Sequence, residues 1–166
     1  MSVESHFGRG VPWEETDLWT ERSEKGYSDE EIVEYTNKID KLYERIESGG
    51  YKSQTQLLAE TPRMTRNQNN DAIHPALNEV AVNIFRDGKL RKKYSGNHRL
   101  AVARVAGIDE IPVQVRTRHR EWQAIRDQIR AVDSYDELRP SVQKHLGHPD
   151  LEDIISEDKG ERRCES

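Results

Sequence analysis

The sequence predicts an α+β fold, a mixture of α and β elements in which a small mixed sheet carries one packed helix with further helices on both sides. Alternating apolar residues at 80–84, and a short apolar run at 111–115, indicate the sheet. A break at Gly96, followed by an Ala- and Val-rich run, indicates the packed helix. Longer stretches of helical periodicity before and after this region indicate the flanking helices.

The N-terminal region predicts an irregular arm followed by an amphipathic helix. Residues 1–27 contain two tryptophans without clear periodicity, so we expect an arm whose tryptophans pack on the domain. Ser28 and Glu31 have the spacing of a capping box, which marks a helix start. Gly49-Gly50 supplies positive φ and ends this helix. Its apolar stripe consists of Ile32, Thr36, Ile39, Tyr43 and Ile46.

A short helix, a polar loop and a β-hairpin are predicted next. The short helix lies within 51–60, and the polar stretch 61–78 has the composition of a loop. Apolar residues alternate through 80–84, which indicates a strand with one buried face. Asp87-Gly88 is a strong two-residue hairpin signal. The return strand is expected at 89–94.

After the hairpin, a packed helix is predicted at 98–106. Gly107 is a suitable C-terminal helix stop, and the strand at 111–115 follows it. Apolar spacing then predicts further helices at 122–132, at 138–146 and from Pro149 onward. The predicted organisation is an irregular arm at 1–27, a domain built around the sheet at 28–117, a helical extension at 118–155 and a disordered tail at 156–166.

Composition limits the kinds of protein that this chain can be. Hydrophobic residues make up 33% of the chain and charged residues 34%, with a net charge of −5, so we expect no general nucleic-acid binder. No run of about 18 apolar residues exists, and the start lacks the basic and apolar regions of a secretory signal. Cys164 is the only cysteine. We therefore expect a cytoplasmic protein with neither a membrane span nor an internal disulfide.

Basic residues gather in the middle of the chain. Seven Lys and Arg residues lie between Arg86 and Arg104, where Asp87 is the only acid, and acidic stretches flank this segment. The pattern fits a local anion site. A solvated strand edge is an equally good explanation of the Lys92-Lys93 pair.

The corner from Ser95 to Arg99 is the strongest candidate site. A helix start presents N–H groups and a partial positive charge, and therefore attracts phosphate or carboxylate. Gly96 lets the backbone approach a ligand, and Asn97 caps the helix or donates to the ligand. His98 and Arg99 supply a titratable and a permanent donor. Alternatively, Gly96 only turns the chain, Asn97 only caps the helix, and Arg99 pairs with an acid.

The run 80–115 resembles the ParB/sulfiredoxin-like superfamily. Its members show a strand pair, a Gly-x-His-Arg or Gly-Glu-Arg-Arg turn, an Ala-rich helix, then a Gly and an IPV strand. Here these parts are Gly96-Asn97-His98-Arg99, the helix after it, Gly107 and Ile111-Pro112-Val113. The helix and glycines at 39–50 look like the preceding helix of the superfamily, so the resemblance covers about half of the chain.

Three short motifs, WEET, GYKSQ and RHREW, look like those of uncharacterised haloarchaeal and viral members. The resemblance implies that the corner holds nucleotide phosphates. Asn97 stands where sulfiredoxin has its catalytic cysteine, which excludes sulfinic acid reduction. The chain has no Asn-Pro phosphate motif and no recognisable helix-turn-helix signature, which argues against a CTP-gated DNA clamp. Ser95 stands where ADP-dependent serine kinases have an acid, which weakens a kinase assignment.

The leading hypothesis is a ParB-like domain that binds a nucleotide or phosphate group at the Gly96-Asn97-His98-Arg99 corner and acts in DNA transactions. One alternative is a phosphotransferase or nucleotide hydrolase on the same corner. Another is a structural or interaction module without catalysis. An acid positioned for metal and base chemistry would distinguish the enzyme from the other two. An affinity that falls steeply with salt concentration would distinguish DNA binding.

Residues near the corner are candidates to line the same pocket. Besides Ser95, these are Arg118, His119 and Trp122, which follow the last predicted strand. Trp122 is then expected to stack a base. In the alternative interpretation, Trp122 belongs to the core and His119 caps a helix.

Two groups of residues are candidates for a metal ion. Asp40 and Glu44 lie one helical turn apart and are candidates to hold Mg²⁺ beside a nucleotide, whereas a solvated helix face is the simpler explanation. His145, His148 and Asp150 have unremarkable spacing, which favours surface histidines over a metal site.

Overall fold

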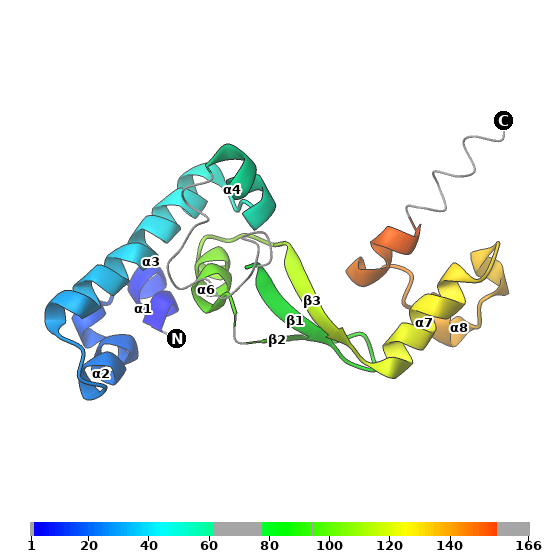
Figure 1. The fold of residues 1–166 in the computed structure, drawn as a ribbon, viewed down its shortest axis with the longest axis horizontal. Helices are drawn as coiled ribbons and strands as arrows, with labels where there is room; N and C mark the ends of the chain where they lie inside the picture. Colours follow the sequence, from blue (N-terminus) through cyan, green and yellow to red (C-terminus); the bar gives the residue numbers. More distant parts are fainter. Residues whose placement is uncertain (1, 62–77, 94, 156–166) are drawn as a thin grey trace. The chain divides into compact units, whose positions relative to one another are not determined.

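The structure, a computed structural model, describes residues 2–61, 78–93 and 95–155 (Figure 1). It is an α+β fold with a small mixed sheet, which confirms the predicted fold class. Most of the predicted loop at 61–78 and the predicted tail at 156–166 lie outside the described residues. The elements are α1 (Ser2–Arg9), η1 (Trp13–Glu15), α2 (Asp17–Glu24), α3 (Asp29–Gly49), α4 (Gln54–Glu60), β1 (Val80–Ile84), β2 (Leu90–Lys92), α6 (Asn97–Val105), β3 (Val113–Arg118), α7 (Arg120–Arg130), η3 (Tyr135–Glu137), α8 (Pro140–Gln143) and η4 (Pro149–Leu151).

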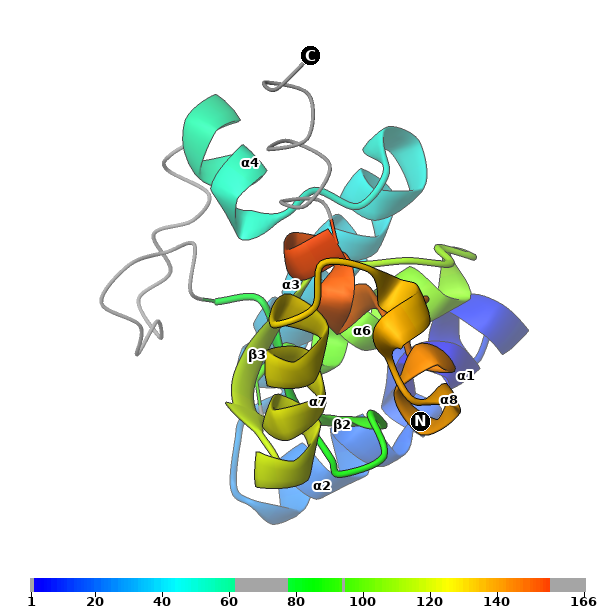
Figure 2. The same ribbon diagram turned by 90° about the vertical axis from the view of Figure 1, so that its right-hand side faces the viewer.

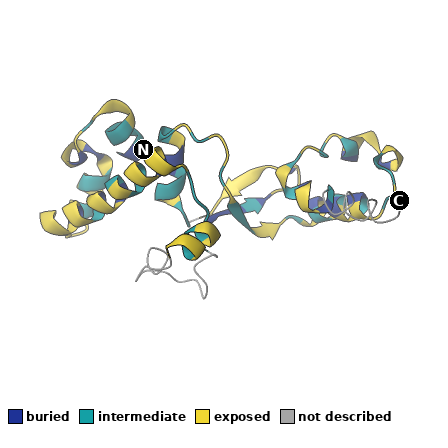
Figure 3. Cartoon of the chain, turned by 90° about the horizontal axis from the view of Figure 1, so that it is seen from above, coloured by how far each residue is buried: buried dark blue, intermediate teal, exposed yellow. Residues whose placement is uncertain are grey.

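The sheet has the strand order β2-β1-β3, so β1 is the central strand. It is also the most buried strand, as Figure 3 shows. β1 pairs antiparallel with β2, with Asn83 opposite Arg91 and Ile84 opposite Leu90. Residues 86–88 join these strands as a three-residue loop, one residue longer than the predicted two-residue turn. Its last residue, Gly88, has a φ of +83°, which favours glycine there.

Contacts divide the chain into two compact units. The N-terminal unit is formed by the described residues of 1–81 and 94–114, and the C-terminal unit by those of 82–93 and 115–155. The division passes through β1 and β3, so each unit contains a part of both strands. The predicted domain at 28–117 and extension at 118–155 differ from this division, because residues 82–93 belong with the C-terminal unit.

The long helix α3 organises the core of the N-terminal unit. Ser28 and Glu31 form the predicted capping box, and Gly50, with a φ of +73°, ends the helix. α6 packs against α1 and α3. In the described part of the chain, no helix is both long enough and apolar enough to cross a membrane. The buried cluster of this unit contains Val3, Trp13, Ile39, Ile46, Ala101 and Val102.

The arm at 1–27 was predicted to be irregular, and the structure corrects this, because α1 and α2 form most of it. Each of these helices has 8 residues, which is too short to show a repeating apolar stripe. Single side chains anchor them: the Phe7 ring stacks on Tyr43 with 4.0 Å between centroids. The expected packing of the tryptophans is seen for both: Trp13 is 7% exposed and donates its indole N–H to Asp40, and the partly buried Trp19 packs against the same core cluster.

Gly96 fixes the position of α6 against β1. Its φ of +79° lies in the left-handed region, and a Cβ at this position would come within 2.8 Å of the Val80 Cα. Glycine is therefore required both for the backbone conformation and for the space. At the other end of α6, Gly107 has a φ of +69° and donates its N–H to the Arg104 carbonyl, as predicted for a helix stop.

The helix α7 supplies much of the core of the C-terminal unit. The hairpin turn packs on this core, because a Cβ at Gly88 would lie 2.7 Å from the Trp122 ring. Figure 2 shows α7 and α8 together with the last described helical residues of the chain. The buried cluster consists of Ile84, Trp122, Ile129, Leu138, Val142, Leu151 and Ile154.

Two C-terminal elements differ from their predicted bounds, and proline explains both. β3 begins after Pro112, which lacks the N–H that a sheet ladder uses. The helix predicted at 138–146 begins only at Pro140, because this proline keeps the residue before it out of helical conformation, and it ends after 4 residues. Leu138 and Val142 are nevertheless buried as the pattern predicts.

Replacing Gly96 with alanine is expected to destabilise the fold by about 2 kcal/mol or more, because a clash with β1 adds to the cost of a left-handed alanine. Gly107→Ala is the matched control, since a Cβ there meets nothing within 4 Å, and its expected cost is about 1 kcal/mol. Urea unfolding followed by circular dichroism measures both losses. Equal losses would mean that the approach to Val80 does not constrain the fold.

Candidate functional site

The structure turns Arg99 inward. Its side chain is 14% exposed and forms an ion pair of 3.1 Å with Glu79, which is 10% exposed. The guanidinium also donates to the carbonyl oxygens of Asn78 at 3.2 Å and Lys52 at 3.0 Å, and it lies 4.8 Å from the centre of the Tyr51 ring. These contacts occupy the guanidinium that was expected to serve as a permanent donor to a bound anion. Arg99 pairs with an acid, as the alternative interpretation expected.

The Arg99–Glu79 pair ties the start of α6 to the start of α4. The Glu79 carboxylate accepts a hydrogen bond from the backbone N–H of Gln54, the first residue of α4. Burial raises the pKa of the neighbouring Tyr51 hydroxyl to about 12, with a smaller upward contribution from Glu79 and an opposing one from Arg99. A carboxylate of the chain itself therefore supplies the anion for this guanidinium, and the pair stabilises the packing of α4 and α6.

Asn97 and His98 line a groove within the N-terminal unit. The groove has a volume of about 440 Å³ and is formed by α1, α2, α3 and α6, and this volume lies in the range of small-molecule sites. The His98 Nε2 atom is 2.9 Å from the Tyr35 hydroxyl. Because both residues belong to the first turn of α6, the positive end of this helix lies at the groove. Ser95 and Gly96 do not line it.

Arg22 of α2 is the central cation of this groove. Its guanidinium carbon lies 3.3 Å from the centre of the Tyr35 ring and 4.8 Å from that of Tyr27. No carboxylate of the described residues forms an ion pair with it. Stacking on aromatic rings holds a guanidinium by its face and leaves its N–H edge for an anionic partner. No sequence pattern indicates a role for Arg22, because α2 has no apolar stripe and the aromatic partners of Arg22 lie outside α2.

The groove is mainly positive. Arg22, Lys25 and the start of α6 contribute positive charge, and Glu21 is the one carboxylate among the described residues that line it. Tyr27 is 45% exposed and presents an aromatic ring at the same place. Such a set of groups can hold an anionic group at its cations and a flat ring beside its tyrosine.

The structure places Arg118, His119 and Trp122 in the C-terminal unit, apart from the lining of the groove. Trp122 is fully buried and donates its indole N–H to Asp150 at 2.9 Å, so it cannot stack a base. His119 caps α7 by accepting from the Glu121 N–H at 3.2 Å. The alternative interpretation of both residues, as core and cap, is therefore what the structure supports.

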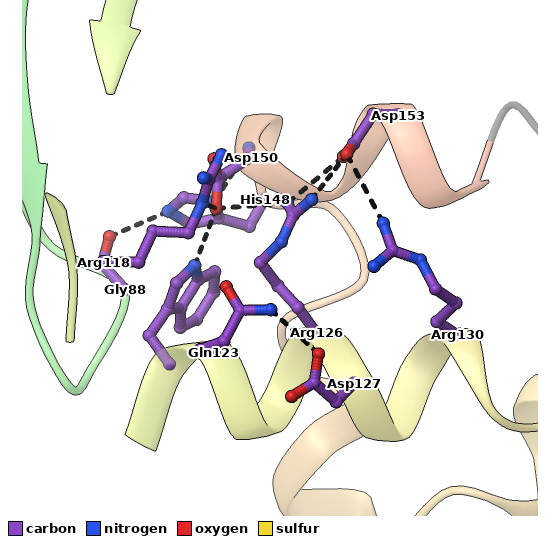
Figure 4. A network of polar contacts seen from close by, with 10 residues as sticks. Gly88, Arg118, Gln123, Arg126, Asp127, Arg130, His148, Asp150 and Asp153 are labelled. Carbon is purple, nitrogen blue, oxygen red and sulfur yellow. Dashed lines mark hydrogen bonds and ion pairs between the residues drawn. The ribbon is translucent and has the colours of Figure 1, made fainter. Parts of the chain in front are cut away.

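A network of polar contacts connects β3, α7 and the last described residues of the C-terminal unit (Figure 4). Asp150 accepts hydrogen bonds from Arg118 at 2.7 and 2.9 Å and lies 3.2 Å from the Arg126 guanidinium. Arg126 is 4% exposed and also donates to Asp153 at 3.1 Å. No local sequence pattern indicates this network, because its members come from β3, α7 and the last described helical residues.

The residues considered for a metal ion take part in other contacts. Asp40 accepts a hydrogen bond from an indole N–H, and neither Asp40 nor Glu44 lines the groove. His148 accepts from the Asp150 N–H at Nδ1 and therefore donates from Nε2 to the Gly88 carbonyl, at 2.8 Å. Within the described ranges, no three His, Cys, Asp or Glu side chains are grouped to hold a metal ion. Magnesium at Asp40 and Glu44 stays a prediction.

Arg99→Ala is expected to lower the free energy of unfolding by about 3–5 kcal/mol, because it leaves the buried Glu79 carboxylate unpaired. The double variant Arg99→Leu with Glu79→Leu removes both charges and is expected to cost less than Arg99→Ala alone. Urea unfolding of the three proteins measures the difference. If Arg99→Ala costs less than 1 kcal/mol, the pair does not hold the corner together.

The contribution of Asp150 to stability is expected to depend on pH. Burial raises the pKa of its carboxyl, but Arg118, Trp122 and Arg126 outweigh burial and hold that pKa below its usual value. The stabilisation is therefore complete above the ordinary aspartate pKa, and it is lost as the pH falls through the lowered value of the folded protein.

Asp150→Asn should consequently destabilise the protein at pH 7, and the difference from the unaltered protein should narrow below about pH 4. Asp153→Asn is the control, because its carboxylate is 53% exposed and should show a smaller effect at both pH values. Urea unfolding at pH 7 and pH 3.5 tests this. A difference that stays constant with pH would contradict the assignment of the effect to the Asp150 charge.

No protein-family model, no curated protein and no solved structure matches the chain. The resemblance to the ParB/sulfiredoxin-like superfamily therefore stays a hypothesis, carried by the Gly96–Arg99 turn and by the order of the elements around it.

Proposed function

We propose that the N-terminal unit binds a small phosphate-bearing ligand, of the nucleotide class, in the groove beside the start of α6. The observation that carries this proposal is the environment of Arg22. Its guanidinium is half-buried, lies against two tyrosine rings, and has no carboxylate partner among the described residues. A phosphate group would complete its hydrogen bonding from the open edge.

Two other arginines of the described residues are withdrawn from water, and each has the carboxylate partner that Arg22 lacks. Arg99 pairs with Glu79, and Arg126 lies between two aspartates. A guanidinium withdrawn from water is costly unless an anion compensates for the lost hydration. The chain itself provides that anion for Arg99 and for Arg126. For Arg22, a ligand from solution is the simplest source of a compensating anion.

The start of α6 supplies a second attraction for the same group. Asn97 and His98 form its first turn and line the groove together with Arg22. The Tyr35 hydroxyl holds the His98 ring at 2.9 Å, and the Tyr35 ring also carries Arg22, so one tyrosine positions two donors. A phosphate placed between them would receive charge-assisted hydrogen bonds from the side chains and a favourable helix dipole.

The size and the aromatic content of the groove favour a nucleotide over inorganic phosphate. A volume of about 440 Å³ exceeds what one phosphate fills. The half-exposed Tyr27 ring provides a surface for a base. Of the corner that the superfamily resemblance implies, the proposal keeps Asn97 and His98, and it makes Arg22 the principal anchor in place of Arg99.

Arg22→Ala is expected to weaken binding of the tightest ligand among ADP, ATP, CTP and inorganic phosphate by about tenfold to a hundredfold, or about 1.5–3 kcal/mol. Each ligand is tested with and without Mg²⁺ by thermal shift, where a concentration of about 100 times the dissociation constant adds about 2.7 kcal/mol of stability. Isothermal titration then gives the affinities.

Arg104→Ala is the matched control, because Arg104 is an exposed arginine at the far end of α6. It should bind the ligand as the unaltered protein does. Melting temperatures without ligand show whether either variant has lost its fold. Equal affinity in the Arg22 variant and the unaltered protein, with both folded, would overturn the proposal.

A further inference from the structure

The β1–β2 hairpin of the C-terminal unit is strongly basic, although the chain as a whole is acidic. Five Lys and Arg side chains lie between residues 86 and 93 and all are exposed, with Asp87 as the one acid in this stretch. Arg116 and Arg120 add two more exposed cations from the neighbouring β3 and α7. In a protein with a net charge of −5, this concentration is a local feature and not the consequence of a basic composition. The hairpin cations are Arg86, Lys89, Arg91, Lys92 and Lys93.

Apolar surface accompanies these charges. Phe85 is 41% exposed and Leu90 is 44% exposed, two of the large apolar side chains that the described surface displays most openly. The Arg91 guanidinium lies 4.9 Å from the centre of the Phe85 ring. The register explains the contact: Arg91 stands opposite Asn83, and Phe85, the residue directly after β1, lies two positions beyond Asn83 on the same side of the hairpin.

The position of β2 leaves this surface accessible within its unit. β2 is an edge strand of the sheet, and its three residues are all exposed. Basic side chains commonly blunt an edge against pairing with another strand. That role does not require an exposed aromatic ring beside the charges, whereas binding of a nucleic acid uses both.

We propose that this basic hairpin, residues 85–93, binds single-stranded nucleic acid. The phosphate backbone lies along the Lys and Arg side chains, and an unpaired base stacks on the Phe85–Arg91 pair. Single strands expose the faces of their bases, while a duplex covers them by stacking, and therefore the exposed ring favours a single strand. The local ion pair between Lys89 and Asp87 is solvent-exposed, so it does not compete strongly with phosphate.

The test measures binding of a labelled oligothymidylate of about 20 nucleotides by fluorescence anisotropy at several NaCl concentrations. The unaltered full-length protein is expected to bind it with an affinity that falls steeply with salt. The triple variant Lys89→Gln, Arg91→Gln, Lys93→Gln removes three phosphate contacts. Since each contact to a single strand contributes about 0.7 to the slope of log affinity against log salt, the slope should decrease by about 2.

A matched control removes the same charge elsewhere in the C-terminal unit. Arg130→Gln, Arg139→Gln and Lys144→Gln are exposed positions outside the hairpin, and this triple variant should keep the salt slope of the unaltered protein. Circular dichroism and melting temperatures establish that both triple variants are folded. A control variant that loses as much affinity as the hairpin variant would mean that net charge alone governs binding, and the proposal would fail.

The role of Phe85 is tested separately. Phe85→Ala should weaken binding of the oligothymidylate by about tenfold, and it should have no effect on an abasic oligonucleotide of the same length.

The preference for a single strand is tested with a duplex of the same length, which should bind more weakly than the oligothymidylate. Duplex binding that equals or exceeds single-strand binding, or no binding at 50 mM NaCl, would overturn the proposal. Arg22→Ala should leave oligonucleotide binding unchanged, which separates this inference from the proposed ligand of the groove.

Discussion

The close approach of Gly96 to Val80 is the constraint on which the N-terminal unit depends. It fixes where α6 begins and therefore which direction each residue of its first turn faces. Successive residues on a helix point about 100° apart. Once α6 starts at this point, Arg99 turns toward Glu79 while Asn97 and His98 line the groove. One backbone contact thus separates the residue that holds the fold together from the residues that are available to a ligand.

The arginines of this chain show how the surroundings decide the role of a side chain. Arg99 and Arg126 are enclosed with carboxylates, and their charges are neutralised inside the protein. Arg22 rests on aromatic rings, which hold its position without neutralising it. Arg91 lies over Phe85 at an exposed strand edge. Since all four carry the same charge, residue type alone does not distinguish a structural arginine from one that binds a partner.

Local patterns predicted the elements well, and the candidate site less well. The capping box at Ser28, the hairpin turn and the helix after Gly96 each depend on residues within a few positions of one another, and each is present. Local patterns could not predict the partners of Arg99, because Arg99 contacts Glu79, 20 residues earlier in the chain, and Lys52, 47 residues earlier. Arg22 was missed because its short helix shows no pattern and its neighbours are recognisable only in space.

The division of the chain has a consequence for how the protein can be taken apart. The path leaves the N-terminal unit after residue 81, returns at 94 and leaves again after 114. Neither unit is a continuous stretch, so no single cut separates the two: a stop codon after residue 114 keeps the N-terminal unit whole only with residues 82–93 of the other unit still attached. During synthesis, the hairpin must also wait until residues near 150 emerge before Trp122 and His148 can enclose its turn.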